Sequence, residues 1–146
     1  MEKSTGQLMS ELNEIISIED FHRKNAPAMQ IPDAAEYILA AAAAKNICRS
    51  ELVNRSGLDR TYAEHLLGGR KRLMREKIII LCLAAALSVE ETQNALKYAA
   101  QPALYPRDRR DSVIIYALRR SMDVTAANEL LDELGLPLLQ LTKSSS

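Results

Sequence analysis

Glycine, proline and aromatic residues are scarce in this sequence of 146 residues, which has five glycines, five prolines, five tyrosines, one phenylalanine and no tryptophan. Alanine, leucine, isoleucine and charged residues are abundant instead, which is the composition of a helical protein and argues against an all-β fold. A net charge is also absent, because 19 basic residues balance 19 acidic ones. Overall charge therefore gives no argument for nucleic-acid binding, and any such argument must be local.

Several kinds of functional site are missing from the sequence. The only two cysteines, Cys48 and Cys82, are too few for a disulfide scaffold, and no Cys/His metal spacing, glycine-rich phosphate loop or nucleophile elbow occurs. We therefore expect no enzymatic activity, no cofactor and no bound metal. The longest apolar run, 78–87, is about half the length that spans a bilayer, and the acidic amino-terminal stretch is unlike a signal peptide. These features predict a cytoplasmic protein that does not enter a membrane.

Hydrophobic periodicity predicts a series of helices with clear boundaries. An acidic amphipathic helix is expected at 5–20, followed by a proline-containing linker that ends at residue 32. Asp33 and Glu36 have the spacing of a capping box and open an alanine-rich helix. Further helices are expected at 51–56, 60–67, 75–87, 88–100, 107–120 and 124–134, with a frayed end at 141–146. The chain is thus divided into an amino-terminal arm, 1–32, a central domain, 33–100, and a carboxyl-terminal helical extension, 101–146.

The segment 49–72, RSELVNRSGLDRTYAEHLLGGRKR, has the pattern of a helix-turn-helix. Gly57 suits a tight turn between two short helices, and apolar residues occupy the positions that such a pair buries. These apolar residues are Leu52, Val53, Leu58, Ala63 and Leu66. The segment resembles the helix-turn-helix of the Xre, Cro and lambda-repressor-like family. The resemblance covers about residues 34–100 and implies an all-α, lambda-repressor-like five-helix bundle with additional flanking helices.

The resemblance also implies a function, namely a sequence-specific transcription regulator that binds double-stranded DNA. Its recognition helix, at 60–67, would enter the major groove. The residues implied to face base edges are Arg60, Thr61, Glu64 and His65, and those implied to contact the DNA backbone are Arg49, Arg70, Lys71 and Arg72. Arginine pairs well with guanine and glutamate with cytosine, which suits Arg60 and Glu64 to direct readout.

Local charge supports this interpretation, although two features depart from the family pattern. Residues 45–75 contain eight basic and three acidic side chains, whereas 1–44 contain three and seven and 76–146 contain eight and nine. Positive charge is therefore concentrated on the segment that would meet phosphate. The departures are an exchange of large and small residues at Val53 and Ala63, which conserves volume, and Cys48 in place of a good helix cap.

The flanking regions leave two questions open. The extension at 101–146 would either form a homodimer, which places two recognition helices about one DNA turn apart, or cover the apolar run 78–87 within one chain. The alternative function is a helical protein-interaction adaptor in a bacterial signalling complex, which keeps the repressor-like fold without binding DNA. Three features favour that alternative: the zero net charge, the acidic residues Asp59 and Glu64 beside the expected contacts, and the large extensions.

Overall fold

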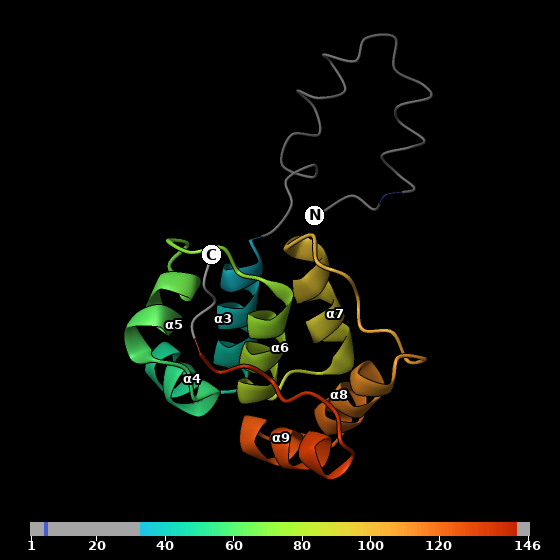
Figure 1. Ribbon diagram of the computed structural model, residues 1–146. Coiled ribbons are helices and arrows are strands. Elements are labelled where there is room, and N and C mark those ends of the chain that lie inside the picture. Colours follow the sequence, from blue (N-terminus) through green and yellow to red (C-terminus); the bar gives the residue numbers. More distant parts are fainter. Residues whose placement is uncertain (1–4, 6–32, 143–146) are drawn as a thin grey trace, which may run out of the picture. The chain divides into compact units, whose positions relative to one another are not determined.

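The computed structural model describes Thr5 and residues 33–142. The helix expected at 5–20 and the linker that follows it lie, apart from Thr5, outside the described residues. In residues 33–142 every regular element is a helix, which confirms the all-α class (Figure 1). These helices are α3 (Ala34–Ala44), α4 (Arg49–Ser56), α5 (Arg60–Leu67), α6 (Arg75–Ala84), α7 (Val89–Tyr98), α8 (Arg109–Arg119) and α9 (Val124–Glu133).

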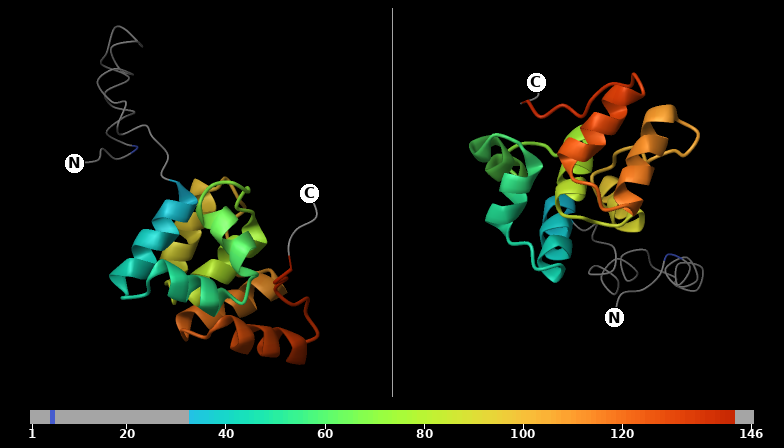
Figure 2. Two further views of the ribbon diagram at one scale, coloured as in Figure 1. Left: turned by 90° about the vertical axis from the view of Figure 1, so that its left-hand side faces the viewer. Right: turned by 90° about the horizontal axis from the view of Figure 1, so that it is seen from below.

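Helix α6 lies at the centre of this helical unit, as the apolar run predicts. All of its residues from Lys77 to Ala84 are buried. Helices α4, α7 and α9 contact it, and α3 contacts α4, α5 and α7 around the same core (Figures 1 and 2). A helix that is apolar on every side can be stable in water only when other elements surround it.

Helices α8 and α9 add to the core of the same chain. Ile114 and Ala117 of α8 and Leu131 of α9 are fully buried, and α9 packs against α6 while α8 packs against α7. The carboxyl-terminal extension therefore covers part of the apolar run within one chain. Its expected role in dimerisation stays a prediction.

Four helix ends depend on a left-handed backbone conformation at residues other than glycine, which the sequence does not predict. The second residue after α3, α6, α7 and α8 has a positive φ, and these residues are Asn46 (64°), Ala86 (55°), Ala100 (55°) and Ser121 (53°). The next amide in each case donates to a carbonyl five residues back, for example Leu87 to Cys82 at 3.0 Å, which is the Schellman pattern. Glycine usually occupies this left-handed position, but none of these four helix ends has a glycine there. The expected ends at residues 87 and 100 are therefore wrong, since α6 ends at Ala84 and α7 at Tyr98.

Side-chain caps fix several helix starts. Asp33 accepts hydrogen bonds from the amides of Ala35 and Glu36, at 2.8 and 3.2 Å. Among the helices described, the reciprocal pair of bonds that defines a capping box forms at α7, between Ser88 and Glu91.

A short extended segment after α9, residues 136–141, forms what we call the C-terminal strap. The side chain of Asn128 on α9 accepts from the Leu139 amide at 2.7 Å and donates to the Leu139 carbonyl at 3.3 Å. Arg110 on α8 donates to the carbonyls of Pro137 and Leu138, at 2.8 and 3.0 Å. The strap is thus bound to two helices through its main chain.

The strap also binds α6. Glu76 on α6 forms an ion pair with Arg110, 2.6 Å between Oε1 and Nη2, and accepts a hydrogen bond from the Gln140 amide at 3.2 Å. The neighbouring Lys77 donates from Nζ to the Gln140 carbonyl. Leu141 is half-buried, so the expectation of a frayed end is wrong for this residue.

The left-handed helix ends lead to a stability prediction. Alanine in the left-handed conformation costs the folded state about 1–2 kcal/mol, and replacing Ala100 with glycine removes this cost. The same substitution stabilises the unfolded state by about 0.4–1 kcal/mol, because glycine gives the unfolded chain more conformational entropy. We expect Ala100→Gly to leave the free energy of unfolding unchanged or to raise it by up to about 1 kcal/mol, while Ala40→Gly, at an exposed position inside α3, lowers it by about 1 kcal/mol. Urea denaturation measures both. Equal destabilisation by the two substitutions would contradict the left-handed assignment.

The ion pair under the strap leads to a pH prediction. Burial alone would raise the pKa of Glu76, but the hydrogen bond and charge of Arg110, with the Gln140 amide, outweigh burial and lower that pKa. A carboxyl with a lowered folded-state pKa stabilises the fold above its unfolded pKa, and this contribution is lost as the pH falls through the folded value. The free energy of unfolding should therefore fall more steeply below about pH 5 in the wild type than in Glu76→Gln. If the unfolding free energies of the wild type and Glu76→Gln change in parallel with pH, this contribution is ruled out. The matched control is Glu90→Gln, at an exposed site on α7.

Candidate nucleic-acid interface

Helices α4 and α5 form the expected pair of short helices joined by a tight turn. Helix α4 begins two residues before the expected start at residue 51, while α5 has the expected bounds. Gly57 ends α4 in the left-handed region, with φ of 74°. Asp59 caps α5 by accepting from the Tyr62 amide at 3.0 Å. The local chemistry of the turn therefore explains both the end of one helix and the start of the next.

Ser56 is a determinant of this turn that the sequence analysis did not identify. Its fully buried hydroxyl donates to the Val53 carbonyl at 2.7 Å and accepts from the Leu58 amide at 3.1 Å. The hydroxyl thus bridges the last turn of α4 and the residue after Gly57. A serine directly before a helix-ending glycine was the available signal, since serine readily bonds nearby main-chain groups.

The inner face of the pair is packed as expected. The five predicted apolar residues Leu52, Val53, Leu58, Ala63 and Leu66 are all buried. Cys48 precedes α4 without a side-chain capping bond, which confirms that it is a poor cap.

The four residues expected to read bases lie on the outer side of α5. Arg60 and Thr61 are exposed, whereas Glu64 and His65 are half-buried. Their spacing along an α-helix places them on one face, opposite the buried Ala63 and Leu66. The sequence pattern therefore gave the correct division of α5 into inner and outer residues.

Two of the predicted contact residues bind each other. The Nε atom of Arg49, at the start of α4, lies 2.9 Å from Oε2 of Glu64, and its Nη2 lies 3.5 Å from the Glu64 carbonyl oxygen. The two side chains are 44% and 38% exposed, so the pair contributes at most about 1 kcal/mol and can be exchanged for other partners. This ion pair links the start of α4 to the middle of α5.

The segment after α5, which we call the basic loop (residues 68–72), is tied to that helix through its main chain. The amides of Arg70 and Lys71 both donate to the His65 carbonyl, at 2.9 and 3.2 Å. A Cβ at Gly68 would lie 3.0 Å from the Glu64 carbonyl oxygen, and Gly69 has φ of 81°, so the two glycines suit this tight path. The side chains of Arg70, Lys71 and Arg72 are exposed beside the end of α5.

The basic residues of 45–75 fall into two groups. Four form ion pairs, namely Lys45 with Glu91, Arg49 with Glu64, Arg55 with Glu51 and Arg75 with Asp111. The other four, Arg60, Arg70, Lys71 and Arg72, form no ion pair within residues 33–142. The basic side chains without a carboxylate partner in this region therefore come from α5 and the basic loop.

Tyr62 connects the inner side of α5 to two lysines. Its side chain is 4% exposed, and Nζ of Lys71 lies 5.6 Å from the ring centroid while Nζ of Lys77 lies 6.0 Å from it. Both distances suit cation–π attraction. Tyr62 thus packs at the helix interface and also contacts Lys71 of the basic loop.

The two thiols differ in their surroundings. The Ser50 hydroxyl and nearby amides lower the pKa of Cys48, which is exposed, whereas burial raises the pKa of Cys82 to about 12. Cys82 is thus a core residue. In the part of the chain that the structure describes, no group of three or more His, Cys, Asp or Glu side chains is arranged to hold a metal ion.

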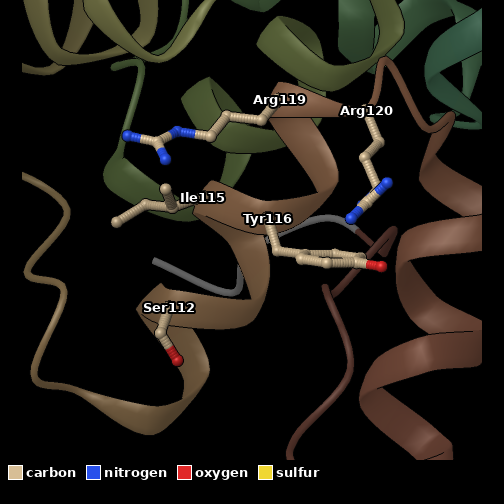
Figure 3. Close-up of a pocket in the computed structure, with 5 residues that line it drawn as sticks. All are labelled: Ser112, Ile115, Tyr116, Arg119 and Arg120. Carbon is tan, nitrogen blue, oxygen red and sulfur yellow. The ribbon is translucent and has the colours of Figure 1, made fainter.

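A second surface feature lies on the outer side of α8. Ser112, Ile115, Tyr116, Arg119 and Arg120 line a shallow pocket of about 400 Å³ (Figure 3). Tyr116 is 44% exposed, and the Arg120 guanidinium lies 4.2 Å from its ring centroid. Arg110, near the start of the same helix, is not a solvated helix end, because it binds Glu76 and the strap.

In comparisons with known proteins, no family model, curated protein or solved structure matched this chain. A search of the described residues found no helix with the length and apolar character needed to cross a membrane.

Proposed function

We propose that this chain is a sequence-specific DNA-binding regulator of transcription, with a lambda-repressor-like helix-turn-helix domain built from α3 to α7. The observation that carries the proposal is the α4–α5 pair. Its apolar side is buried, and its outer side carries Arg60, Thr61, Glu64 and His65 next to the exposed basic loop. An exposed helix face flanked by cations suits insertion into the major groove between two phosphate backbones.

In this proposal the residues divide their roles between bases and phosphates. Arg60, at the first position of α5, pairs with guanine through two hydrogen bonds, while Thr61, Glu64 and His65 face the neighbouring bases. Arg70, Lys71 and Arg72 contact phosphate, as does Arg49 once it exchanges Glu64 for a phosphate oxygen. Such an exchange is inexpensive because the existing pair is exposed. A homodimer would place two α5 helices on successive half-sites of a palindrome.

The decisive experiment compares wild type and Arg60→Ala on a selected operator and on its single-base variants. Loss of a bidentate base contact should weaken binding to the preferred site by about 1–3 kcal/mol and relax discrimination at one base pair of each half-site, with nonspecific binding nearly intact. Arg107→Ala removes the same charge from the exposed segment before α8 and serves as the control. Arg60 would be excluded as a base-reading residue if the wild type showed no preference among DNA sequences. The same would follow if Arg60→Ala lost binding affinity equally on all sequences.

The phosphate contacts are tested through salt dependence. Arg72→Gln should weaken binding about equally on all sequences and reduce the slope of log K against log salt by about 1, because one fewer counterion is released. Fluorescence anisotropy over a salt series measures the slope. An unchanged slope would remove Arg72 from the interface.

A protein-interaction adaptor is the second candidate, and the outer side of α8 favours it. Ile115 and Tyr116 place apolar surface beside Arg119 and Arg120, a mixture that is common in protein interfaces (Figure 3). In this case Tyr116→Ala would abolish capture of a protein partner, and the wild type would bind no DNA selectively.

A further inference from the structure

We infer that the C-terminal strap is a positioning element for α5, acting through Lys77 and Tyr62 and through the turn at Gly57. As a contribution to DNA recognition this role rests on the proposed function, whereas its effect on α5 can be measured without DNA. The strap is bound to α6, α8 and α9 and touches the α4–α5 pair at its far end.

The first contact runs through a buried lysine. Lys77 is 2% exposed, and its Nζ donates to the Gln140 carbonyl of the strap and lies 6.0 Å from the Tyr62 ring centroid. A buried ammonium group needs acceptors in place of water, and the strap supplies one of them. When the strap leaves, the Lys77 ammonium loses this acceptor and becomes hydrated, and the contact that Lys77 makes with Tyr62 on α5 weakens.

The second contact lies on the turn itself. A Cβ placed on Gly57 would be 3.4 Å from Cδ1 and 3.8 Å from Cδ2 of Leu141, so this strap side chain lies directly over the turn. Gly57 determines how α4 leads into α5, because its left-handed φ ends the first helix. Leu141 therefore restricts movement at the point where the two helices meet.

The anchors of the strap lie outside the α4–α5 pair, which makes the role testable. Asn128 binds both main-chain groups of Leu139 from α9, and Arg110 and Glu76 bind the neighbouring residues from α8 and α6. Neither α4 nor α5 contributes to these bonds. A substitution at Asn128 therefore reaches α5 through the strap and leaves every predicted DNA contact in place.

The experiment uses the full chain and reads strap release from the reactivity of the Lys77 amine. Asn128→Ala should increase the rate of acetylation at Lys77 about tenfold, since the loss of two hydrogen bonds shifts a local opening equilibrium by this order. The exposed Lys97 is the internal reference, detected in the same mass spectra. Asn94→Ala is the matched control, because Asn94 is an exposed residue of α7 bonded to the Tyr37 hydroxyl.

DNA binding and amide exchange then separate positioning from stability alone. Asn128→Ala should bind the operator about three- to tenfold more weakly with an unchanged salt slope, because no phosphate contact is removed. The amides of α5 should exchange faster than in wild type. Leu141→Ala, which removes the contact with the turn, should weaken DNA binding without a change at Lys77.

Each opposite result overturns the inference. Unchanged Lys77 reactivity in Asn128→Ala would show that the strap is not held as described. Increased reactivity with unchanged α5 exchange would show that the strap covers Lys77 without positioning α5. If wild type binds no DNA, the proposed function fails by itself, and α5 exchange alone decides whether the strap positions this helix. Should Asn128→Ala fail to fold, Asn128→Asp keeps the acceptor for the Leu139 amide and provides the same comparisons.

Discussion

The burial of α6 on all sides is the constraint on which the rest of this fold depends. Its run of apolar residues offers no face to water, so the surrounding helices and the C-terminal strap must enclose it. The α4–α5 pair is one part of this enclosure. Two helices of eight residues each have little stability in isolation, and their geometry is therefore set by what they pack against.

Charged residues serve the interior and the surface in different ways. Glu76, Lys77 and Arg110 satisfy main-chain groups of the strap, while Arg60 and the basic loop have no carboxylate partner in the described helical unit. A count of charges along the sequence merges these two groups. Within residues 45–75, separating them leaves Arg60, Arg70, Lys71 and Arg72, on α5 and the loop after it, as the cations without a carboxylate partner in the described helical unit.

Much of the fold was predictable from local chemistry, and the misses share a physical cause. The helical class, the central apolar helix and the turn at Gly57 follow from periodicity and from a residue type that fits its conformation. The ends at Ala84 and Tyr98 were missed because Ala86 and Ala100 adopt a conformation that alanine disfavours, and tertiary packing has to stabilise it. Helix propensity depends on the local sequence alone and therefore takes no account of such packing.

The candidate site was predictable to a similar depth. The outer face of α5 follows from helical spacing, but the Arg49–Glu64 pair joins residues on different helices, and no spacing rule gives that contact. Lys77 and Glu76 were not recognised as structural residues because their partners, Gln140 and Arg110, lie far away in the sequence. Contacts of this kind depend on the path of the whole chain.

The order of residues along the chain has a consequence for biosynthesis. Gln140 and Leu141 are translated after Lys77 and Gly57, which they contact, so a nascent chain carries α5 and the basic loop before the acceptor for Lys77 exists. Until then the Lys77 ammonium remains hydrated and the core beneath Tyr62 is unfinished. A chain truncated between residues 134 and 139 would therefore contain all seven described helices but would lack the main-chain acceptor that the strap supplies to Lys77.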